Sequence, residues 1–393
     1  MKKLTFLLGI SVVVFTLSVT VVSCNKGKSP APEPAPLDEP ALPEAAYRYE
    51  EKHGVGNHLA TLGRVLFYDR KMSVNNAVSC GSCHKQEFAF ADNVKVNKGF
   101  DGQALTRNSP SIQGLRGSFA NRFQTMQAIN NGFMPPNTDS QPKELLFWDG
   151  RQNSLVDMVL NPVLNHREMN IPDFPTLERK LSELSYYPGL FQNAFGDQKI
   201  TKQRIAEALE GFIACLNTDN GQNSNVFNNN FNPDGSSKLT GIAEQGRLLF
   251  HNKYNCAKCH DPSNTGTYGT VTSPTQMFNI GLDEVYNDNG LGALTRKEGD
   301  KGVFKVPTLK NIALTAPYMH DGRFANLSEV IDHYSHEIKP NKNLSSQFIA
   351  LDGTPKKLNI NASEKTALIA FLNTLKDEDF LTSPMYADPF KSK

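Results

Sequence analysis

Two five-residue motifs carry the clearest chemistry in the sequence, CGSCH at residues 80–84 and CAKCH at residues 256–260. Two thiols one helical turn apart can reach the two vinyl groups of one porphyrin, and the histidine after them can present its imidazole to the iron. Paired cysteines can instead hold zinc as thiolates. Because both pairs carry the histidine, we predict two covalently bound haem c groups, with these attachment and proximal residues: Cys80, Cys83, His84, Cys256, Cys259 and His260.

The overall composition limits the classes of protein that are possible. The 393 residues carry 41 Lys and Arg against 40 Asp and Glu, a formal charge of +1, so the chain has no basic field to bind a nucleic acid. The length allows about two domains at roughly 150 residues each. Six cysteines are too few for a disulfide scaffold in a chain of this length. Cys215 falls on the apolar face of a predicted helix, where we expect a buried thiol.

The first 46 residues resemble an export leader followed by a tether. A basic start, an apolar run over 4–22 and Ser23 precede Cys24. This order resembles a bacterial lipobox; an uncleaved membrane anchor and plain secretion are the alternatives. We predict a lipoprotein signal peptide over 1–23, lipidation of Cys24, and an extended proline-rich tether over 24–46. The folded part would then lie in the periplasm or cell envelope, held to a membrane by its lipid anchor.

Past residue 46 the same signals occur twice in the same order. A repeat longer than a hundred residues indicates duplicated domains rather than a solenoid. We predict a mainly α protein of two cytochrome c-like haem domains related by internal duplication, over 47–232 and 233–393, with long ordered loops. The matched segments, first half then second, are 63–67 with 246–250, 80–84 with 256–260, and 148–151 with 320–323.

Two amphipathic patterns predict helices that frame these motifs. Thr201 can cap a helix whose apolar residues fall on one face, and an Asn-rich segment up to residue 232 marks the domain boundary. A second helix is predicted near the end of the chain. The apolar positions are Ile205, Leu209, Phe212, Ile213 and Leu216 in the first helix, and Leu368, Phe371, Leu372 and Leu375 in the second.

Further motifs give the chain a family resemblance. RNSP at 107–110, WDGR at 148–151 and KVPTLKNIALTAPYMHDGRF at 305–324 occur in this order around the two CxxCH motifs. Together they resemble the bacterial dihaem cytochrome c peroxidase family, which includes MauG-like enzymes. The resemblance covers roughly residues 47 to 380.

The resemblance implies roles for individual residues. The N-terminal haem would be the peroxide site, and electrons would enter at the C-terminal haem. Trp148 matches the tryptophan between the haems, and Glu168 matches the distal carboxylate that moves a proton from one peroxide oxygen to the other. Asn108, with the backbone carbonyls of Thr315 and Pro317, matches the calcium site between the domains, whose oxygen ligands suit that hard ion.

The chain departs from the family pattern on the peroxide side. Many members close this haem with a histidine, but no histidine occurs between residues 85 and 107, and Phe100 lies near the expected slot. We therefore predict an open peroxide haem that needs no prior reduction, with His166 as the one nearby residue that could close it. The family's distal glutamine is replaced by Met158, which removes a hydrogen-bond donor and adds an oxidisable thioether.

A third departure concerns the second haem. The family's axial methionine is replaced by Tyr334, as in MauG, and the neighbouring His333 is the rival ligand. A phenolate stabilises ferric iron and lowers its potential, whereas methionine raises it. At the same offset the first half has Pro162, which has no ligating side chain. The two halves therefore differ where one iron is expected to be capped and the other open.

We expect an enzyme, a dihaem peroxidase that reduces hydrogen peroxide to water with electrons from a small cytochrome c or copper protein outside the cytoplasm. The first alternative is a MauG-like oxidase that oxidises residues of a partner protein. The second is a non-catalytic electron-transfer cytochrome, which requires both irons to be six-coordinate. The resemblance also implies that the chain can form a homodimer.

Overall fold

The computed structural model describes residues 39–41, 57–115, 145–216, 237–260 and 276–391. The chain divides into two compact units, 1–35 and 36–393, and every described residue belongs to the second unit. The predicted signal peptide, Cys24 and the Asn-rich boundary segment lie outside the described residues. None of the described helices has the length and hydropathy needed to span a bilayer.

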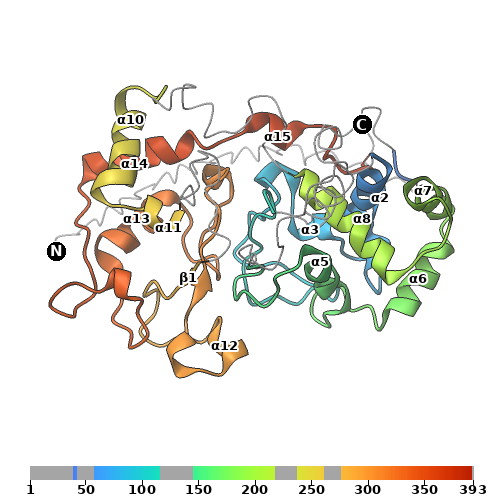
Figure 1. The fold of residues 1–393 in the computed structure, drawn as a ribbon, viewed down its shortest axis with the longest axis horizontal. Helices are drawn as coiled ribbons and strands as arrows, with labels where there is room; N and C mark the ends of the chain where they lie inside the picture. The colour runs from blue at the N-terminus through green and yellow to red at the C-terminus, as the bar shows by residue number, and fades with distance from the viewer. Residues whose placement is uncertain (1–38, 42–56, 116–144, 217–236, 261–275, 392–393) are drawn as a thin grey trace, which may run out of the picture. The chain divides into compact units, whose positions relative to one another are not determined.

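Helices dominate the described part of the chain, as predicted from the sequence (Figure 1). Before the gap at 217–236 the elements are α2 (Asn57–Tyr68), η1 (Arg70–Met72), α3 (Cys80–Cys83), η2 (Gln86–Phe88), α5 (Leu155–Leu164), α6 (Phe174–Ser182), α7 (Tyr186–Phe195) and α8 (Lys202–Cys215).

The elements after this gap include the one sheet among the described residues, an antiparallel pair of β1 (Met277–Phe278) and β2 (Phe304–Lys305). The helical elements are α10 (Gly241–Leu248), η4 (Leu249–Lys253), α11 (Ala257–His260), α12 (Gly292–Thr295), η5 (Glu298–Asp300), η6 (Ile312–Leu314), α13 (Leu327–Asp332), η7 (His333–Glu337), η8 (Ser346–Phe348), α14 (Ala362–Asn373) and α15 (Glu378–Thr382).

Helix α8 forms where the sequence predicts it. The Thr201 hydroxyl oxygen accepts a hydrogen bond from the Arg204 backbone N–H at 3.3 Å, which satisfies one of the unpaired donors at a helix start. The apolar face of the helix is buried, from Ile205 through Phe212. Cys215 ends the helix and is 1% exposed, so the prediction of a buried thiol is confirmed.

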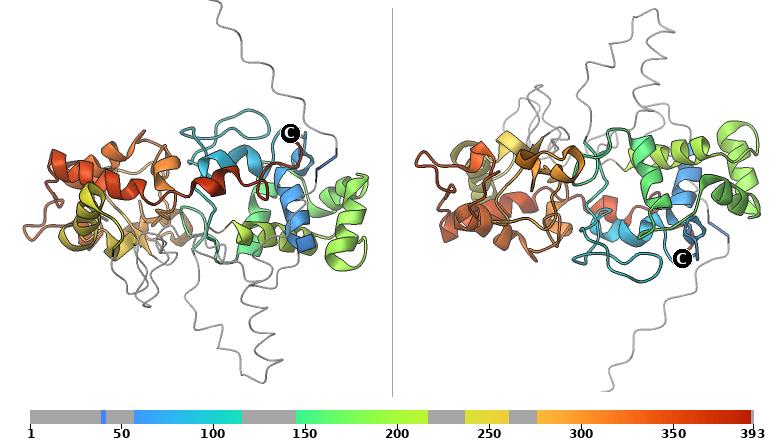
Figure 2. Two further views of the ribbon diagram at one scale, coloured as in Figure 1. Left: turned by 90° about the horizontal axis from the view of Figure 1, so that it is seen from above. Right: turned by 90° about the horizontal axis from the view of Figure 1, so that it is seen from below.

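The two halves use the same close helix crossing. Helix α2 packs on α8, and α10 packs on α14 (Figures 1 and 2). A Cβ atom on Gly63 would lie 1.8 Å from the Ala208 carbonyl oxygen, and one on Gly246 would lie 1.9 Å from the Ala367 carbonyl oxygen. Because the backbones meet without room for a side chain, only glycine fits at either crossing.

The end of the chain packs into the core that the first half builds. Phe380, Tyr386 and Phe390 belong to the buried cluster formed by α2, α5, α7 and α8. The Tyr68 hydroxyl donates to the Tyr386 carbonyl at 2.7 Å. A second cluster joins η4, α13 and α14. The domain division at 232/233 remains a prediction. The C-terminal segment follows the second half in the sequence but packs into the core of the first half.

Candidate functional site

The first CxxCH motif forms the short helix α3. The Ser79 backbone N–H donates to Ser82 Oγ at 2.9 Å and helps to start the turn. This turn places the Cys80 and Cys83 thiols together. Burial raises the pKa of both thiols to about 12. The thiols and the histidine that follows them are the groups that covalent attachment of a porphyrin requires.

His84 is oriented as a proximal ligand requires. Its Nδ1 lies 2.9 Å from the Phe90 carbonyl oxygen. Since a carbonyl can only accept, Nδ1 must carry the proton and Nε2 keeps its lone pair. Burial lowers the pKa of His84 and keeps the ring neutral, which is the form that binds iron.

Glu168 is a half-buried carboxylate near the first attachment site. It lies on the turn after α5, and the Asn165 amide donates to its Oε1 at 2.7 Å. Burial raises the pKa of Glu168, while Arg151 and Asn165 partly oppose that effect. The carboxylate also raises the pKa of both thiols of the motif. The structure thus brings Glu168 to the first CxxCH motif across about eighty residues of sequence.

The loop that lacks the closing histidine pairs with the Glu168 turn. The Phe100 N–H donates to the Glu168 carbonyl at 2.8 Å. A Cβ atom on Gly99 would lie 1.8 Å from the Arg167 carbonyl oxygen, so glycine permits this approach. His166 is exposed. Met158 is buried on α5 within the first core.

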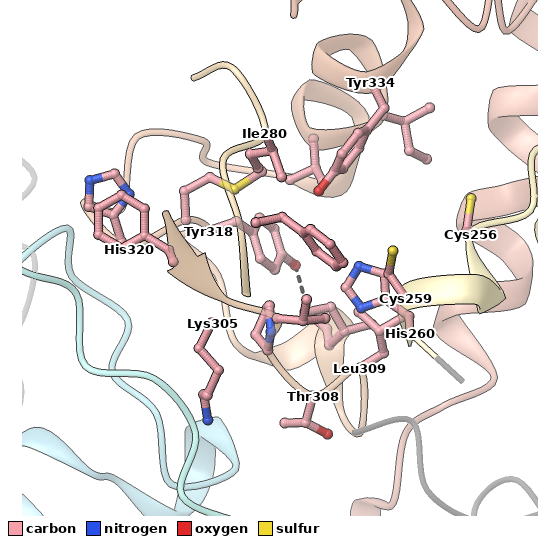
Figure 3. A pocket seen from close by; sticks show the side chains of 18 of the residues that line it. Cys256, Cys259, His260, Ile280, Lys305, Thr308, Leu309, Tyr318, His320 and Tyr334 are labelled. Carbon is pink, nitrogen blue, oxygen red and sulfur yellow. Dashed lines mark hydrogen bonds between the residues drawn. The ribbon is translucent and has the colours of Figure 1, made fainter. Parts of the chain in front are cut away.

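The second CxxCH motif opens onto an apolar cavity of about 520 Å³ (Figure 3). Cys256, Cys259 and His260 lie on one side, and residues such as Ile280 and Leu309 line the rest. Burial raises the pKa of Cys256 to about 12 and lowers the pKa of His260 to about 4. This motif therefore has the same neutral thiols and neutral imidazole as the first.

Tyr334 and His333 lie in different surroundings. Figure 3 shows Tyr334 across the cavity from His260. Burial, and secondarily the thiols of Cys256 and Cys259, raise the pKa of Tyr334. His333 Nε2 instead lies 3.0 Å from the Ile280 carbonyl oxygen, and His333 is not among the residues that line the cavity. The described geometry therefore directs Tyr334, rather than His333, toward the second motif.

Three buried nitrogens in the wall of this cavity lack hydrogen-bond partners among the described residues. They are His260 Nδ1, His320 Nδ1 and Gln113 Nε2. The His320 ring stacks on Phe304 with centroids 3.8 Å apart. A buried donor without a partner costs about 1–3 kcal/mol. An apolar cavity with buried, unpaired nitrogens and a CxxCH motif suits haem c, which is mainly apolar and carries carboxylates.

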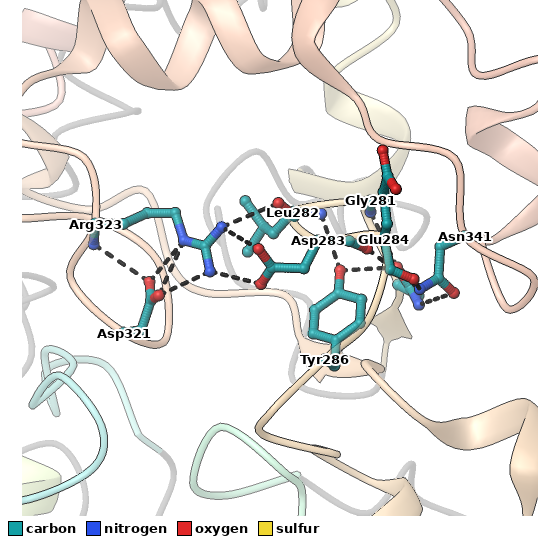
Figure 4. Close-up of polar contacts among 9 residues, drawn as sticks. Gly281, Leu282, Asp283, Glu284, Tyr286, Asp321, Arg323 and Asn341 are labelled. Atoms are coloured by element: carbon teal, nitrogen blue, oxygen red, sulfur yellow. Dashed lines mark hydrogen bonds and ion pairs between the residues drawn. The ribbon is translucent and has the colours of Figure 1, made fainter.

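A network of ion pairs holds the loop that forms one wall of the cavity (Figure 4). The Arg323 guanidinium donates to Asp283 Oδ2 at 2.6 Å, to Asp321 Oδ2 at 2.9 Å and to the Leu282 carbonyl at 3.0 Å. The Tyr286 hydroxyl accepts from the Leu282 N–H at 2.9 Å. Bidentate pairs of this kind fix geometry, so the network fixes residues 281–286 beside the cavity.

Trp148 joins elements from both halves. Its indole N–H donates to the Asn108 carbonyl at 2.9 Å, and its own carbonyl accepts from the Lys305 N–H at 2.8 Å. Asn108, Thr315 and Pro317 line the same cavity. No group of three His, Cys, Asp or Glu side chains in the described ranges could hold a metal ion. The predicted calcium ligands are amide and carbonyl oxygens, a different set of donors.

Sequence reasoning missed Asn165, the residue that holds the Glu168 carboxylate. Asn165 caps the end of α5, and its side chain also accepts from the Arg167 N–H at 2.9 Å. An asparagine at the end of a predicted helix commonly makes such a turn. That signal could have identified the turn, but not the contact with the carboxylate.

Two CxxCH motifs, one near a half-buried carboxylate and one in an apolar cavity, form the pattern of a c-type cytochrome with two haem centres. The model of the family described as di-haem cytochrome c peroxidase matches residues 57–232. Methylamine utilization protein MauG of Methylophilus methylotrophus is 28% identical over 355 residues, covering 89% of this chain and 88% of the relative. Cytochrome c551 peroxidase of Nitrosomonas europaea is 25% identical over 370 residues, covering 93% and 91%.

A solved structure also resembles most of the chain. The crystal structure of a MauG-like protein associated with microbial copper homeostasis has a TM-score of 0.67 at 26% identity, covering 92% of this chain and 99% of that chain. The chain is therefore similar to the di-haem cytochrome c peroxidase family, over 57–232 to the family model and over most of its length to individual relatives. This family implies two haem c groups. Its members similar to this chain include both MauG proteins and cytochrome c peroxidases.

Proposed function

We propose that this chain reduces hydrogen peroxide to water at the first haem, with electrons from a small redox protein outside the cytoplasm. The observation that carries the proposal is Glu168, a half-buried carboxylate of raised pKa near Cys80 and Cys83. A carboxylate in that position can take and return a proton during peroxide chemistry, a step that simple electron transfer does not include.

The residues of the first site divide the work between binding and proton transfer. Cys80, Cys83 and His84 would hold haem c, which supplies the iron that binds peroxide and takes its oxidising equivalents. Asn165 engages Oε1 of Glu168, so we assign proton transfer to Oε2. Glu168 takes a proton from one peroxide oxygen and delivers it to the other, which leaves as water.

We propose that this site is open in the oxidised protein. Phe100 cannot ligate iron, and the exposed side chain of His166 supports its absence from the site. Prior reduction would then not be needed. Met158 packs in the first core, which favours a packing role for the residue that replaces the family's glutamine.

We assign Tyr334 as the axial ligand of the second haem, held by Cys256, Cys259 and His260. The placement of Tyr334 in the cavity, and the contact of His333 with a backbone carbonyl, support this choice. An anionic oxygen ligand lowers the iron potential. Trp148, which bonds to Asn108 and Lys305, would carry electrons between the two haems.

A second candidate function is oxidation of a partner protein by a MauG-like reaction. The tyrosine in the second cavity favours it, because a low-potential haem is a poor acceptor from a high-potential donor and a good store for an oxidising equivalent. Fast turnover with a reduced small cytochrome c or copper protein would favour the peroxidase. Modification of a protein substrate without such turnover would favour the oxidase.

We propose three further features that the sequence motifs support. The leader and Cys24 give a lipid-anchored protein of the periplasm or cell envelope. The matched glycine crossings at Gly63 and Gly246 favour two duplicated haem domains.

The third feature is a calcium site. Asn108, Thr315 and Pro317 would bind calcium, and a chelator should then slow electron transfer between the haems without releasing either haem. An unchanged rate would remove the calcium assignment.

The experiment that tests the function is a stoichiometric peroxide titration of the fully ferric, haem-loaded protein, followed by its absorption spectrum. A prompt change without added electrons supports an open peroxide site. A change that requires one electron per protein would assign a reductively gated peroxidase instead. No reaction in either state would leave the chain as an electron carrier and overturn the proposal.

A further inference from the structure

Asp69 is a buried carboxylate that accepts hydrogen bonds from two tyrosines. It is 3% exposed. The hydroxyls of Tyr186 and Tyr187 both donate to its Oδ2 at 2.7 Å. Its Oδ1 accepts from the Lys71 backbone N–H at 2.7 Å. These three donors are neutral, so Asp69 presents a desolvated base to two phenols at once.

One of these tyrosines lies beside the first haem attachment site. Tyr187 is fully buried and packs in the same core cluster as Cys80. Helix α2 contacts both α3, which carries Cys80, and α7, which carries Tyr187. The Tyr187 hydroxyl is thus held by a carboxylate inside the core against which the porphyrin attachment point packs.

The second tyrosine extends this arrangement to the surface. The rings of Tyr186 and Tyr187 have centroids 4.7 Å apart at 45°, which is direct contact. Tyr186 begins helix α7 and is only partly buried. Ser185, its neighbour, bonds to Glu39 at 2.9 Å. Two aromatic rings in contact therefore lead from the core against which Cys80 packs to the partly exposed Tyr186.

We propose that Tyr187 and Tyr186 form a proton-coupled relay that carries single oxidising equivalents from the first haem to the surface, with Asp69 as the base. The inference rests on the proposed function, because the peroxide-oxidised haem is the oxidant. A phenol gives up an electron readily only if its proton has an acceptor at the same moment, since the protonated radical is a very strong acid. Asp69 provides that acceptor to both rings.

The step balances in one electron and one proton. Tyr187 gives an electron to the oxidised haem and its phenolic proton to Asp69 Oδ2, which leaves a tyrosyl radical and a neutral carboxylic acid. Tyr186 then reduces Tyr187 by the same transfer of one electron and, through Asp69, one proton. A one-electron donor at the surface restores Tyr186. The relay would bring oxidising equivalents to the protein surface, where oxidation of a partner protein requires them.

The test uses full-length, haem-loaded protein mixed with one equivalent of hydrogen peroxide and no electron donor. Samples are frozen for electron paramagnetic resonance, and a spin trap marks the radical for peptide mass spectrometry. We expect a tyrosyl signal and a trapped adduct on Tyr186. Tyr186→Phe should lose the adduct, and Tyr187→Phe should lose the adduct and lengthen the life of the oxidised haem.

Two further variants separate the relay from packing. Tyr68→Phe is the matched control, since Tyr68 lies against Gly81 of the same motif but donates to a backbone carbonyl; its radical yield should equal that of the unmodified protein. Asp69→Asn keeps an acceptor for Lys71 and removes the base, so the tyrosyl signal should vanish. The half-buried Tyr186 keeps the test informative if a change at Tyr187 prevents folding.

The outcomes also separate this inference from the function on which it rests. If peroxide changes the haem spectrum but no adduct forms on Tyr186, or if Tyr186→Phe keeps the same radical, the relay is wrong and the peroxidase stands. Loss of the radical in Tyr68→Phe would indicate a route other than Tyr187 and Tyr186, and it would also overturn the relay proposal. If peroxide leaves the haem spectrum unchanged, both proposals fall.

Discussion

The two halves of the chain have similar helices, but the segments that follow α5 and α13 carry different residues. Each crosses two helices at a glycine, Gly63 or Gly246. Each also has a tight turn with glycine at positive φ, +69° at Gly150 and +62° at Gly322, and a capped helix after that turn, α5 or α13.

After these helices the two halves diverge. Helix α5 contains Pro162 and ends in a turn that presents Glu168. Helix α13 continues into η7, a single π-helical turn that carries Tyr334. A π turn shifts the direction of the side chains beyond it and is frequent at functional sites. The difference teaches that similar helices can present either a carboxylate or a phenol through a few residues beyond the helix, as the proposed open and capped haem sites would require.

The largest expected effect comes from removing the carboxylate that distinguishes the first site from the second. Glu168→Gln should lower peroxide turnover by about 10²–10⁴-fold, the usual contribution of a general acid–base group, while both haem spectra persist. Turnover is measured with a reduced donor protein. Glu183→Gln, an exposed change on the same half, is the control. Equal loss in both variants, or none in either, would remove Glu168 from the mechanism.

Removing the Tyr334 hydroxyl tests the proposed iron ligand of the second haem. Tyr334→Phe should change the absorption and resonance spectra of one haem only and raise its potential, because an anionic oxygen ligand is lost. Tyr318→Phe is the matched control, since Tyr318 lines the same cavity but its hydroxyl donates to the Ile312 carbonyl at 2.8 Å. If Tyr334→Phe leaves both spectra unaltered, the ligand assignment is wrong.

The pH dependence of peroxide turnover tests the role of Glu168 at the first site. The carboxylate must be ionised to take a proton from peroxide, and burial raises its pKa. Turnover should therefore fall as pH drops, beginning at a higher pH than the ordinary range of a glutamate near 4.3. Stopped-flow rates across pH 4 to 8 would measure this limb. A limb that persists unchanged in Glu168→Gln would assign it to another group.

The smallest expected effects concern the shared framework. Gly63→Ala and Gly246→Ala should each destabilise the fold by at least ~1–3 kcal/mol, because the added methyl meets a backbone carbonyl. Gly189→Ala is the control, since nothing lies within 4 Å of its Cβ position in α7 and alanine favours a helix by about 1 kcal/mol. Thermal unfolding measures all three. A large difference between Gly63→Ala and Gly246→Ala would show that the halves do not share this packing.

Local patterns predicted the framework well. The start of α8 at Thr201 and the burial of its apolar face were predictable from period and capping, because these depend on neighbours within one or two turns. The attachment motifs were equally local. The return of Phe380 and Tyr386 to the first core had no local signal, since packing between distant segments leaves none in a single sequence.

The sequence by itself determined which residues are chemically able to act: two CxxCH motifs, a glutamate followed by a methionine, and a tyrosine at the position where the resemblance implies a methionine. Their chemistry resides in the side chains and their spacing. Only the tertiary structure decided which of them face a site. Tyr334 rather than His333 lines the second cavity, and Asp69 meets two tyrosines, because side-chain direction and burial are set by packing between segments far apart in the chain.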